Sequence, residues 1–345
     1  MSNGLDPAQL TPAASLNRVR FVEVPGVALP PEMLDRTAFE LFSARALEDL
    51  SRTVPDSDIL ARRFGERLGW LLVTLRRGDP PSRVVRPDWD DSYWQHWAGI
   101  STVYLGGGIV SGRLGPGIAE QASRTLAAAG LPDCAVRVAP WPEHLPLIGA
   151  ARTIPEADAA VVLDFGQSFV KRACAQYQYI DGDLASLRIL PRRPARWTDI
   201  AHGPGPTSED VRRLGDFMVE TMADTWRAAR ARTPDLSVTI VASLASYLRN
   251  GRPLARQGGA YSTLLALSDN LEAWLSDRVS VALDRPLTVR LLPDATAAAH
   301  VWAGEPHAAV IMLGTALGIG FPPAAEPCRP FSPRFMVIAP EPEPA

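Results

Sequence analysis

The residues best suited to chemistry lie in the segment LDFGQSFVK, residues 163–171. Lys171, at its end, is the only lysine among 35 lysines and arginines. Asp164 ends an apolar run, where burial of a carboxylate is unfavourable unless it is paired, hydrated or near a cation. A Mg²⁺ ion held through water would suit this carboxylate. A glycine-containing turn follows, and its backbone N–H groups could face phosphate oxygens. The turn consists of Gly166, Gln167 and Ser168.

A second carboxylate with catalytic potential is Asp294, which follows the apolar run LTVRLL (287–292) and opens the segment ATAAAHVWAG. As a general base it would lie at the C-terminal edge of a sheet, where ligands of α/β proteins bind. It could equally be an ordinary helix N-cap. In the same way, Asp164 could cap the backbone of its turn. Lys171 could be a surface lysine or an ion-pair partner that only stabilises the strands.

Two further glycine-rich elements also follow apolar runs. The run ISTVYL (100–105) is followed by three consecutive glycines, and AAVIMLGT (308–315) leads into more glycine-rich sequence. Glycine at such positions lets the backbone approach an anion, although most glycines at strand ends only make turns. The candidate residues are Gly106, Gly107, Gly108, Gly314, Thr315 and Gly318.

The apolar periodicity predicts a mixed α/β protein with two lobes. The segments 159–165, 169–178 and 184–190 are expected to form an antiparallel meander, because Asp181-Gly182 is a strong hairpin signal. The other expected strands are 18–24, 100–105, 135–139, 237–245, 287–292 and 308–315. The expected helical segments are 31–53, 57–77, 114–130, 144–152, 208–232, 268–283 and 294–303. Thr207 and Asp210 are expected to form a capping pair at the start of 208–232.

The remaining segments are expected to be irregular. The stretch 78–98 is rich in Pro, Asp and Trp and predicts a loop, whose tryptophans could stack on a carbohydrate or simply cap a lobe or contact another subunit. Frequent prolines predict poor order for residues 1–17 and 322–345.

Composition limits the class of protein. A chain of 345 residues can form one large or two ordinary domains, and its net charge of −3 provides no basic field for nucleic acid. No apolar run reaches the roughly 20 residues that a membrane span needs. The N-terminus lacks a secretion signal, and the three cysteines show no metal or disulfide spacing. We therefore expect a cytoplasmic protein with no nucleic-acid or membrane partner.

Taken together, these motifs resemble the sugar kinases of the actin-like ATPase superfamily, most closely the ROK family (repressors, open reading frames, kinases). LDFGQSFVKRA is similar to the family's first phosphate motif, Asp-x-Gly-Gly-Thr-x-x-Lys. Gln167 replaces the second glycine and Ser168 the threonine. The resemblance implies a two-lobed, ribonuclease H-like fold that uses ATP and Mg²⁺, with Asp164 near the metal and Lys171 near the phosphates.

Four other segments extend the resemblance. SDNLEAW (268–274) implies that Asn270 touches a sugar hydroxyl, and LLPDATAAA (291–299), with Pro293 in place of the family's Asn, implies that Asp294 is the catalytic base. MLGTALGIGF (312–321) resembles the second phosphate motif. VYLGGGIVSG (103–112) resembles the adenosine motif, and LPLIGAA (145–151) the helix that ends the family's chain.

The order of these motifs differs from that of the family, in which the adenosine motif and the terminal helix come last. Here they precede the first phosphate motif, which indicates a circular permutation. The expected divisions are an N-terminal segment (1–56), the first part of a nucleotide-binding lobe (57–152), the lobe with the first phosphate motif and Asp294 (153–303), and the second part of the nucleotide-binding lobe with a Pro-rich tail (304–345).

The family's Glu-x-Gly-His motif and Cys-rich zinc site are missing, so no zinc is expected. The predicted function is ATP-dependent phosphoryl transfer to a sugar hydroxyl, with a small-molecule sugar and a nucleotide as partners. A non-catalytic nucleotide- or sugar-binding protein on the same scaffold is the alternative. A dinucleotide oxidoreductase is disfavoured, because Gly106–Gly108 lack its glycine spacing. Homodimer formation is left open.

Overall fold

The computed structural model describes residues 6, 9–155, 157–195, 206–255 and 259–340. The chain is a mixed α/β protein, as the sequence predicts, and it divides into two compact units. Unit 1 comprises Met1–Leu145 and Glu305–Pro323, and unit 2 comprises Pro146–Gly304 and Ala324–Ala345.

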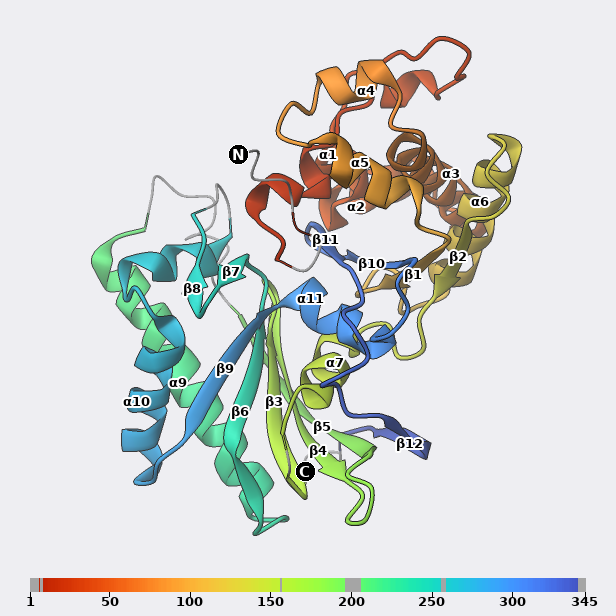
Figure 1. The fold of residues 1–345 in the computed structure, drawn as a ribbon. Helices are drawn as coiled ribbons and strands as arrows, with labels where there is room; N and C mark the ends of the chain where they lie inside the picture. The colour runs from red at the N-terminus through yellow and green to blue at the C-terminus, as the bar shows by residue number, and fades with distance from the viewer. Residues whose placement is uncertain (1–5, 7–8, 156, 196–205, 256–258, 341–345) are drawn as a thin grey trace. The chain divides into compact units, whose positions relative to one another are not determined.

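Unit 1 contains a four-stranded sheet of order β11-β10-β1-β2 (Figure 1). Its strands are β1 (Thr102–Gly106), β2 (Ala135–Val138), β10 (Ala308–Leu313) and β11 (Leu317–Gly320). β1 pairs in parallel with both β10 and β2, whereas β11 returns antiparallel to β10. The sheet therefore joins two early strands to two late ones, with all of Pro146–Gly304 between them in the chain.

The longest helix of unit 1 packs closely on a second helix. Its helices are α1 (Ala38–Phe42), α2 (Ala44–Thr53), α3 (Ser57–Arg77), α4 (Pro80–Val84), α5 (Asp91–Ala98) and α6 (Leu114–Ala128). A Cβ added at Gly65 of α3 would lie 2.6 Å from the carbonyl oxygen of Ile118, and one at Gly69 would lie 2.5 Å from Cβ of Thr125. The two glycines therefore allow α3 and α6 to approach each other.

The segment 31–53 forms a 3-10 turn and two short helices, which corrects the prediction of one helical stretch. The turn is η3 (Pro31–Met33). Asp35 then adopts a left-handed backbone with φ 61°. Thr37 opens α1 with a capping box that includes Glu40, and the Ser43 side chain accepts from the N–H of Ala46 to start α2. These local caps break the stretch because each starts a new helix.

The Trp-rich stretch 78–98 contains α4 and α5, so the prediction of an irregular loop is wrong. Prolines occupy the first positions of α4, where a missing N–H has no consequence, and Asp90 caps α5 through the N–H of Tyr93. Trp89, Trp94 and Trp97 are buried. These rings are core residues of unit 1, and their faces are not open for stacking on a carbohydrate.

The N-terminal segment packs onto unit 1, contrary to the predicted poor order, wherever it is described. Leu10, Ala14 and Leu16 are buried. The Asn17 side chain binds the edge of β11, donating to the carbonyl of Leu317 (2.7 Å) and accepting from its N–H (2.9 Å). The Asn17 amide thus takes the hydrogen-bonding position that the backbone of another strand would occupy. This segment contains two 3-10 turns, η1 (Pro12–Ala14) and η2 (Leu16–Arg18). The predicted strand is wrong, because residues 18–24, all of them described, contain one isolated bridge, Arg20 to Thr37, and no strand.

Unit 2 contains a six-stranded sheet of order β12-β5-β4-β3-β6-β9 (Figure 1). Its strands are β3 (Ala159–Phe165), β4 (Phe169–Tyr177), β5 (Leu184–Pro194), β6 (Leu236–Leu244), β9 (Thr288–Pro293) and β12 (Phe331–Ile338). The predicted antiparallel meander β3–β4–β5 is confirmed. β6 and β9 continue the sheet in parallel with β3, and β12 pairs in parallel with β5. A small hairpin, β7 (Leu248–Arg249) with β8 (Arg252–Pro253), follows β6.

β12 lies within the segment predicted to be poorly ordered, so that prediction is wrong for residues 331–338. Two arginines fix the approach to this strand. The guanidinium of Arg329 donates to the carbonyls of Ile154, Pro155 and Gly182, and the guanidinium of Arg152 donates to the carbonyl of Arg329. Tertiary contacts thus order a segment whose composition alone indicated a loose tail. Residues 341–345 lie outside the described part of the chain.

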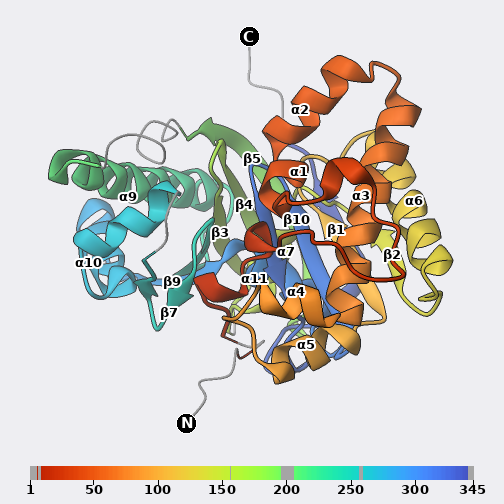
Figure 2. The ribbon, with the colours of Figure 1, turned by 90° about the horizontal axis from the view of Figure 1, so that it is seen from above.

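Helices cover both faces of the unit 2 sheet (Figure 2). Helices α9 (Ser208–Arg230) and α10 (Leu271–Leu283), with η4 (Ala260–Ala266), pack on one face. Helices α7 (Leu145–Arg152) and α11 (Asp294–Ala299), followed by η5 (His300–Trp302), pack on the other. The predicted capping pair of Thr207 and Asp210 is confirmed as a capping box. No helix in the described parts of the chain is both long and apolar enough to cross a membrane.

The free edge of the unit 2 sheet at β9 is covered by side chains of α10. Three residues spaced four apart along α10 accept backbone N–H groups from alternate residues along the edge. The pairs are Glu272 with Leu291 (2.7 Å), Ser276 with Val289 (2.9 Å) and Ser280 with Leu287 (2.9 Å). The helical and strand periods match over this distance. The helix therefore satisfies edge groups that would otherwise be open to another strand.

Candidate functional site

Asp164 is the most buried charged residue among the predicted site residues, at 3% exposed. It lies opposite Lys171 across the β3–β4 pair and opposite Ser243 across the β3–β6 pair. Its Oδ2 lies 3.1 Å from Nζ of Lys171, and its Oδ1 accepts from the hydroxyl of Ser243 at 2.8 Å. Both carboxylate oxygens thus have partners that compensate for burial.

This pairing decides between the interpretations of Asp164 and Lys171. Asp164 is bonded to side chains of the neighbouring strands, which is not the turn-capping arrangement. Lys171 is an ion-pair partner, with its side chain 26% exposed. An ion pair that is open to solvent on the lysine side can stabilise the meander and still leave Nζ within reach of a ligand.

Hydrogen bonds with neighbouring residues fix the turn of Gly166, Gln167 and Ser168. The N–H of Gly166 donates to the carbonyl of Phe169 (3.2 Å), and its carbonyl accepts from the hydroxyl of Tyr261 (3.0 Å). Burial, together with the charge of Asp164, raises the pKa of Tyr261, so its hydroxyl remains a donor. Ser168, on the same turn, is exposed.

Asp294 is the first residue of α11, directly after β9, with Pro293 as the N-cap. Its Oδ1 accepts from the N–H of Ala295 at 2.7 Å, so it is not the ordinary N-cap that the sequence also allowed. Ser243 pairs with Leu292, which places Asp294 two residues beyond the row that contains Asp164 and Ser243. Asp294 is half-buried.

These residues share one edge and one face of the unit 2 sheet. β3, β6 and β9 are parallel, so their carboxyl ends meet at one edge, where ligands of α/β proteins bind. Alternation along the strands puts Asp164, Lys171 and Ser243 on the face covered by α7 and α11. Asp294 opens α11 on that same face. We define these four residues as the candidate site of unit 2.

Asn270 does not belong to this group. It is the exposed N-cap of α10, a helix on the opposite face of the sheet, and its Oδ1 accepts from the N–H of Ala273 at 3.0 Å. The structure therefore explains this residue by a capping role. Its contact with a sugar hydroxyl stays a prediction.

In unit 1 the other two glycine turns lie against each other. The N–H of Ile109, just beyond Gly106–Gly108, donates to the carbonyl of Leu313 at 3.3 Å. A Cβ at Gly107, where φ is 94°, would overlap that same carbonyl, so only glycine allows this approach. An added Cβ at Gly108 would meet no atom within 4 Å.

The β10–β11 turn supplies the remaining predicted phosphate contacts of unit 1. An added Cβ at Gly314 would also meet nothing within 4 Å, and Thr315 is exposed. The carbonyl of Gly314 accepts from the N–H of Ala44, at the start of α2 (2.8 Å). Gly318 lies in β11 opposite Met312. The six predicted residues of unit 1 thus lie on two adjacent turns or on the strand residues that flank them.

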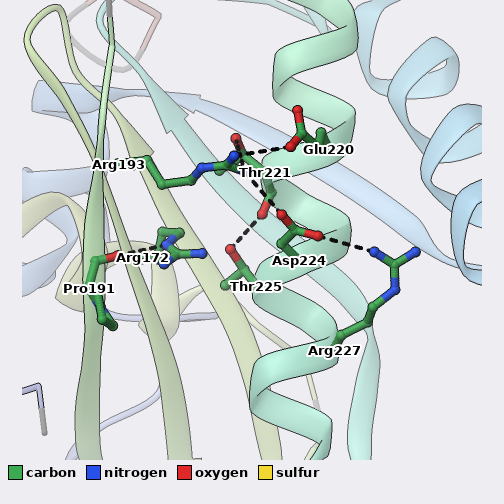
Figure 3. Close-up of polar contacts among 8 residues, drawn as sticks. All are labelled: Arg172, Pro191, Arg193, Glu220, Thr221, Asp224, Thr225 and Arg227. Carbon is green, nitrogen blue, oxygen red and sulfur yellow. Dashed lines mark hydrogen bonds and ion pairs between the residues drawn. The ribbon is translucent and has the colours of Figure 1, made fainter. Parts of the chain in front are cut away.

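A polar network between β5 and α9 carries more charge than the candidate site but has a structural explanation (Figure 3). Arg193 donates to Glu220, Thr221 and Asp224 at 3.1–3.2 Å, and Arg227 also pairs with Asp224. Both carboxylates therefore have arginine partners. The network lies on the α9 face, opposite the candidate site, and it fixes α9 to the sheet.

Two residues next to Asp164 were not predicted. Ser243 is the last of three hydroxyl residues in the run SVTIVASLA, and its position among the apolar residues at the end of the run was the available signal. Tyr261 is 95 residues from its partner Gly166 in sequence, and nothing local points to it.

The residues at this site fit a metal ion that is held through water. Within the described residues, no group of three or more His, Cys, Asp or Glu side chains is placed to hold a metal ion. Asp164 offers one carboxylate whose oxygens already accept from Ser243 and Lys171. A hydrated Mg²⁺ fits one such carboxylate better than a directly coordinated ion does.

A scan against protein-family models found none that matches this chain. A search of curated proteins found no match either.

Proposed function

We propose that the protein transfers the γ-phosphoryl group of ATP to a sugar hydroxyl, as a relative of the ROK sugar kinases. The observation that carries this proposal is the candidate site of unit 2. It places an acid–lysine pair and a second carboxylate on one face, at the carboxyl edge of three parallel strands.

Each residue has a distinct role in the proposed reaction. Asp294 accepts the proton of the attacking hydroxyl, which requires a carboxylate within hydrogen-bond reach of the substrate. Lys171 offsets negative charge on the phosphates, and Asp164 holds a water ligand of Mg²⁺. The bound metal would supply charge neutralisation on the phosphate oxygens. The turns at Gly106–Gly108 and Gly314–Gly318 are proposed to contact the nucleotide through backbone N–H groups.

The sheet connections support a circularly permuted, two-lobed actin-like ATPase fold of the ribonuclease H-like type. In unit 2 the antiparallel meander is followed by two parallel strands, which agrees with the meander that the resemblance implies. In unit 1 the strand before the proposed adenosine turn comes early in the chain, and the strand before the second phosphate turn comes late, yet the two are neighbours. A rotated chain order would produce this pairing.

A coupled ADP-release assay over hexoses, hexosamines and their N-acetyl forms tests the function. In Asp294→Asn we expect turnover to fall by about 10²–10⁴-fold, while calorimetry shows ATP affinity nearly unchanged. The matched control is Asp284→Asn, an exposed C-cap of α10 whose φ of 50° asparagine tolerates. Unchanged turnover in Asp294→Asn would contradict the assignment of the base.

A non-catalytic binding protein on the same scaffold is the second candidate. It is favoured by the engaged oxygens of Asp164 and by the capping role of Asn270, which leave fewer groups dedicated to catalysis. Saturable binding of ATP with Mg²⁺, without ADP release for any sugar of the panel, would select this candidate.

A further inference from the structure

Trp141 has a backbone conformation that its residue type disfavours. Four non-glycine residues in the described ranges have positive φ. Three of them, Asp35, Asn250 and Asp284, are short polar types that tolerate the left-handed region. The fourth is Trp141, at φ 48°. A bulky aromatic residue there is an outlier, and outliers of this kind cluster at functional sites.

Burial of the indole does not account for this strain. Trp141 is 42% exposed, which makes it the most exposed of the described tryptophans. The other aromatic rings of unit 1 show the contrast, because Trp94 and Trp97 are 2% and 0% exposed. A strained backbone that gained stability from core packing would hide its side chain in the same way.

The strained segment is fixed to a glycine turn of unit 1. The carbonyl of Pro142, the next residue, accepts from the N–H of Gly107 at 2.7 Å. The carbonyl of Trp141 accepts from the N–H of His144 at 2.9 Å. The first bond holds the segment beside the Gly106–Gly108 turn, and the second closes a turn within the segment. The space around Gly108 is open. An exposed aromatic ring is thus kept next to a turn that is accessible at Gly108.

We propose that Trp141 provides a stacking face for the purine base of the nucleotide. This inference rests on the proposed function, which assigns a nucleotide to this turn. An indole offers a large, rigid apolar face, and stacking of a base on such a ring contributes substantially to binding. The indole of Trp141 lies at the surface, where stacking on a base is possible.

The test uses a substitution for which strain and stacking predict opposite effects. Trp141→Gly suits the positive φ and removes the ring, so the melting temperature should not fall while ATP affinity drops by about 10-fold. Inorganic tripolyphosphate, which has no base, should bind the variant as it binds the natural chain. Trp141→Phe should retain most of the ATP affinity. The control is Asp35→Gly, which makes the same backbone change elsewhere in unit 1 and should leave ATP binding unchanged.

The outcomes separate this inference from the function on which it rests. If the natural chain binds ATP and Trp141→Gly binds it equally well, the stacking role is wrong and the proposed function stands. An equal loss of ATP and tripolyphosphate in Trp141→Gly would also overturn the stacking role, because the change would then act on the phosphates. Failure of the natural chain to bind any purine nucleotide would overturn both proposals.

Discussion

The sheets of the two units share one arrangement of four strands. In unit 2 the hairpin β3–β4 is extended by the parallel strands β6 and β9, and in unit 1 the hairpin β10–β11 is extended in the same way by β1 and β2. The edge strands correspond as well. Ser276 of α10 accepts from the N–H of Val289 in β9, and Ser123 of α6 accepts from the N–H of Val136 in β2, with the same 13-residue separation.

The two hairpins differ in what they carry before the turn. A glycine directly follows the first strand in both. Two residues earlier, unit 2 has Asp164 opposite Lys171, whereas unit 1 has Met312 opposite Gly318. The same backbone thus presents paired charges in one unit and a small, uncharged surface in the other. In the proposed function, the charged hairpin of unit 2 would contact the metal and the phosphates, and the uncharged hairpin of unit 1 would contact the nucleotide through its backbone.

The largest expected effect comes from making the unit 2 hairpin resemble that of unit 1. Asp164→Met removes the carboxylate and leaves Lys171 and Ser243 without it. We expect a loss of about 2–3 kcal/mol in the free energy of unfolding, below the range for fully buried pairs because Lys171 is partly exposed. Asp164→Met with Lys171→Met removes both charges and should recover most of that stability, but none of the ATP-dependent turnover.

Urea unfolding measures the stabilities, with Glu120→Gln as the control. Glu120 forms an exposed pair with Arg124 on α6, and its loss should change stability by less than about 0.5 kcal/mol. If Asp164→Met were as stable as the natural chain, the ion pair would contribute nothing to the free energy of unfolding. Recovery of turnover in the double variant would remove both residues from the proposed mechanism.

An intermediate effect concerns pH, because each unit has a histidine with a lowered pKa. Burial lowers the pKa of His96 in unit 1, and the charge of His307 lowers it further. Burial lowers the pKa of His300 in unit 2, although its bond to the carbonyl of Thr296 acts in the opposite direction. The unfolded chain therefore binds more protons than the fold does. The contribution of the two neutral histidines to the free energy of unfolding should be fully present above about pH 6.5. On acidification below that pH, the free energy of unfolding should decrease by up to about 1.4 kcal/mol per pH unit for each histidine.

Unfolding measured from pH 7.5 to 5 checks this expectation. His96→Phe and His300→Gln should each reduce the slope. A variant that keeps the full slope would show that its histidine is protonated equally in the folded and unfolded chains.

The smallest expected effect comes from removing the serine hydroxyl that accepts a backbone N–H of the edge strand in each unit. Ser276→Ala should lower the free energy of unfolding by about 1 kcal/mol, since a backbone N–H of the edge strand loses its acceptor. Ser123→Ala should have a smaller effect, because its bond is longer, at 3.3 Å against 2.9 Å. Urea unfolding of the two variants tests the order, and a larger effect at Ser123 would contradict it.

Local signals explain which elements could be predicted from sequence. The helix expected at 57–77 is observed over those residues, since Asp56 caps its start and Gly78 ends it with a φ of 51°. The meander followed from apolar runs and the Asp181-Gly182 turn. The segment 78–98 was misjudged because its prolines and aspartates, which suggested a loop, occupy the first turns and caps of short helices.

The candidate site was predictable only where its residues are close in sequence. Asp164 and Lys171 are seven residues apart on one hairpin, so hairpin geometry and strand alternation indicate that they lie close together. Ser243 lies 79 residues from Asp164, and its contact depends on the register of β6 against β3. Asn270 is ambiguous in a different way, because an asparagine before an apolar helix suits capping as well as ligand binding.

The hydrogen bonds of Asn17 have a practical consequence for handling the protein. Proteolysis just beyond Asn17 would remove both partners of Leu317 and leave the outer edge of β11 uncovered. An uncovered edge strand can pair with strands from other molecules, so a small loss in mass would produce an aggregation-prone species. Affinity tags that must be cleaved should therefore be designed so that this residue remains intact.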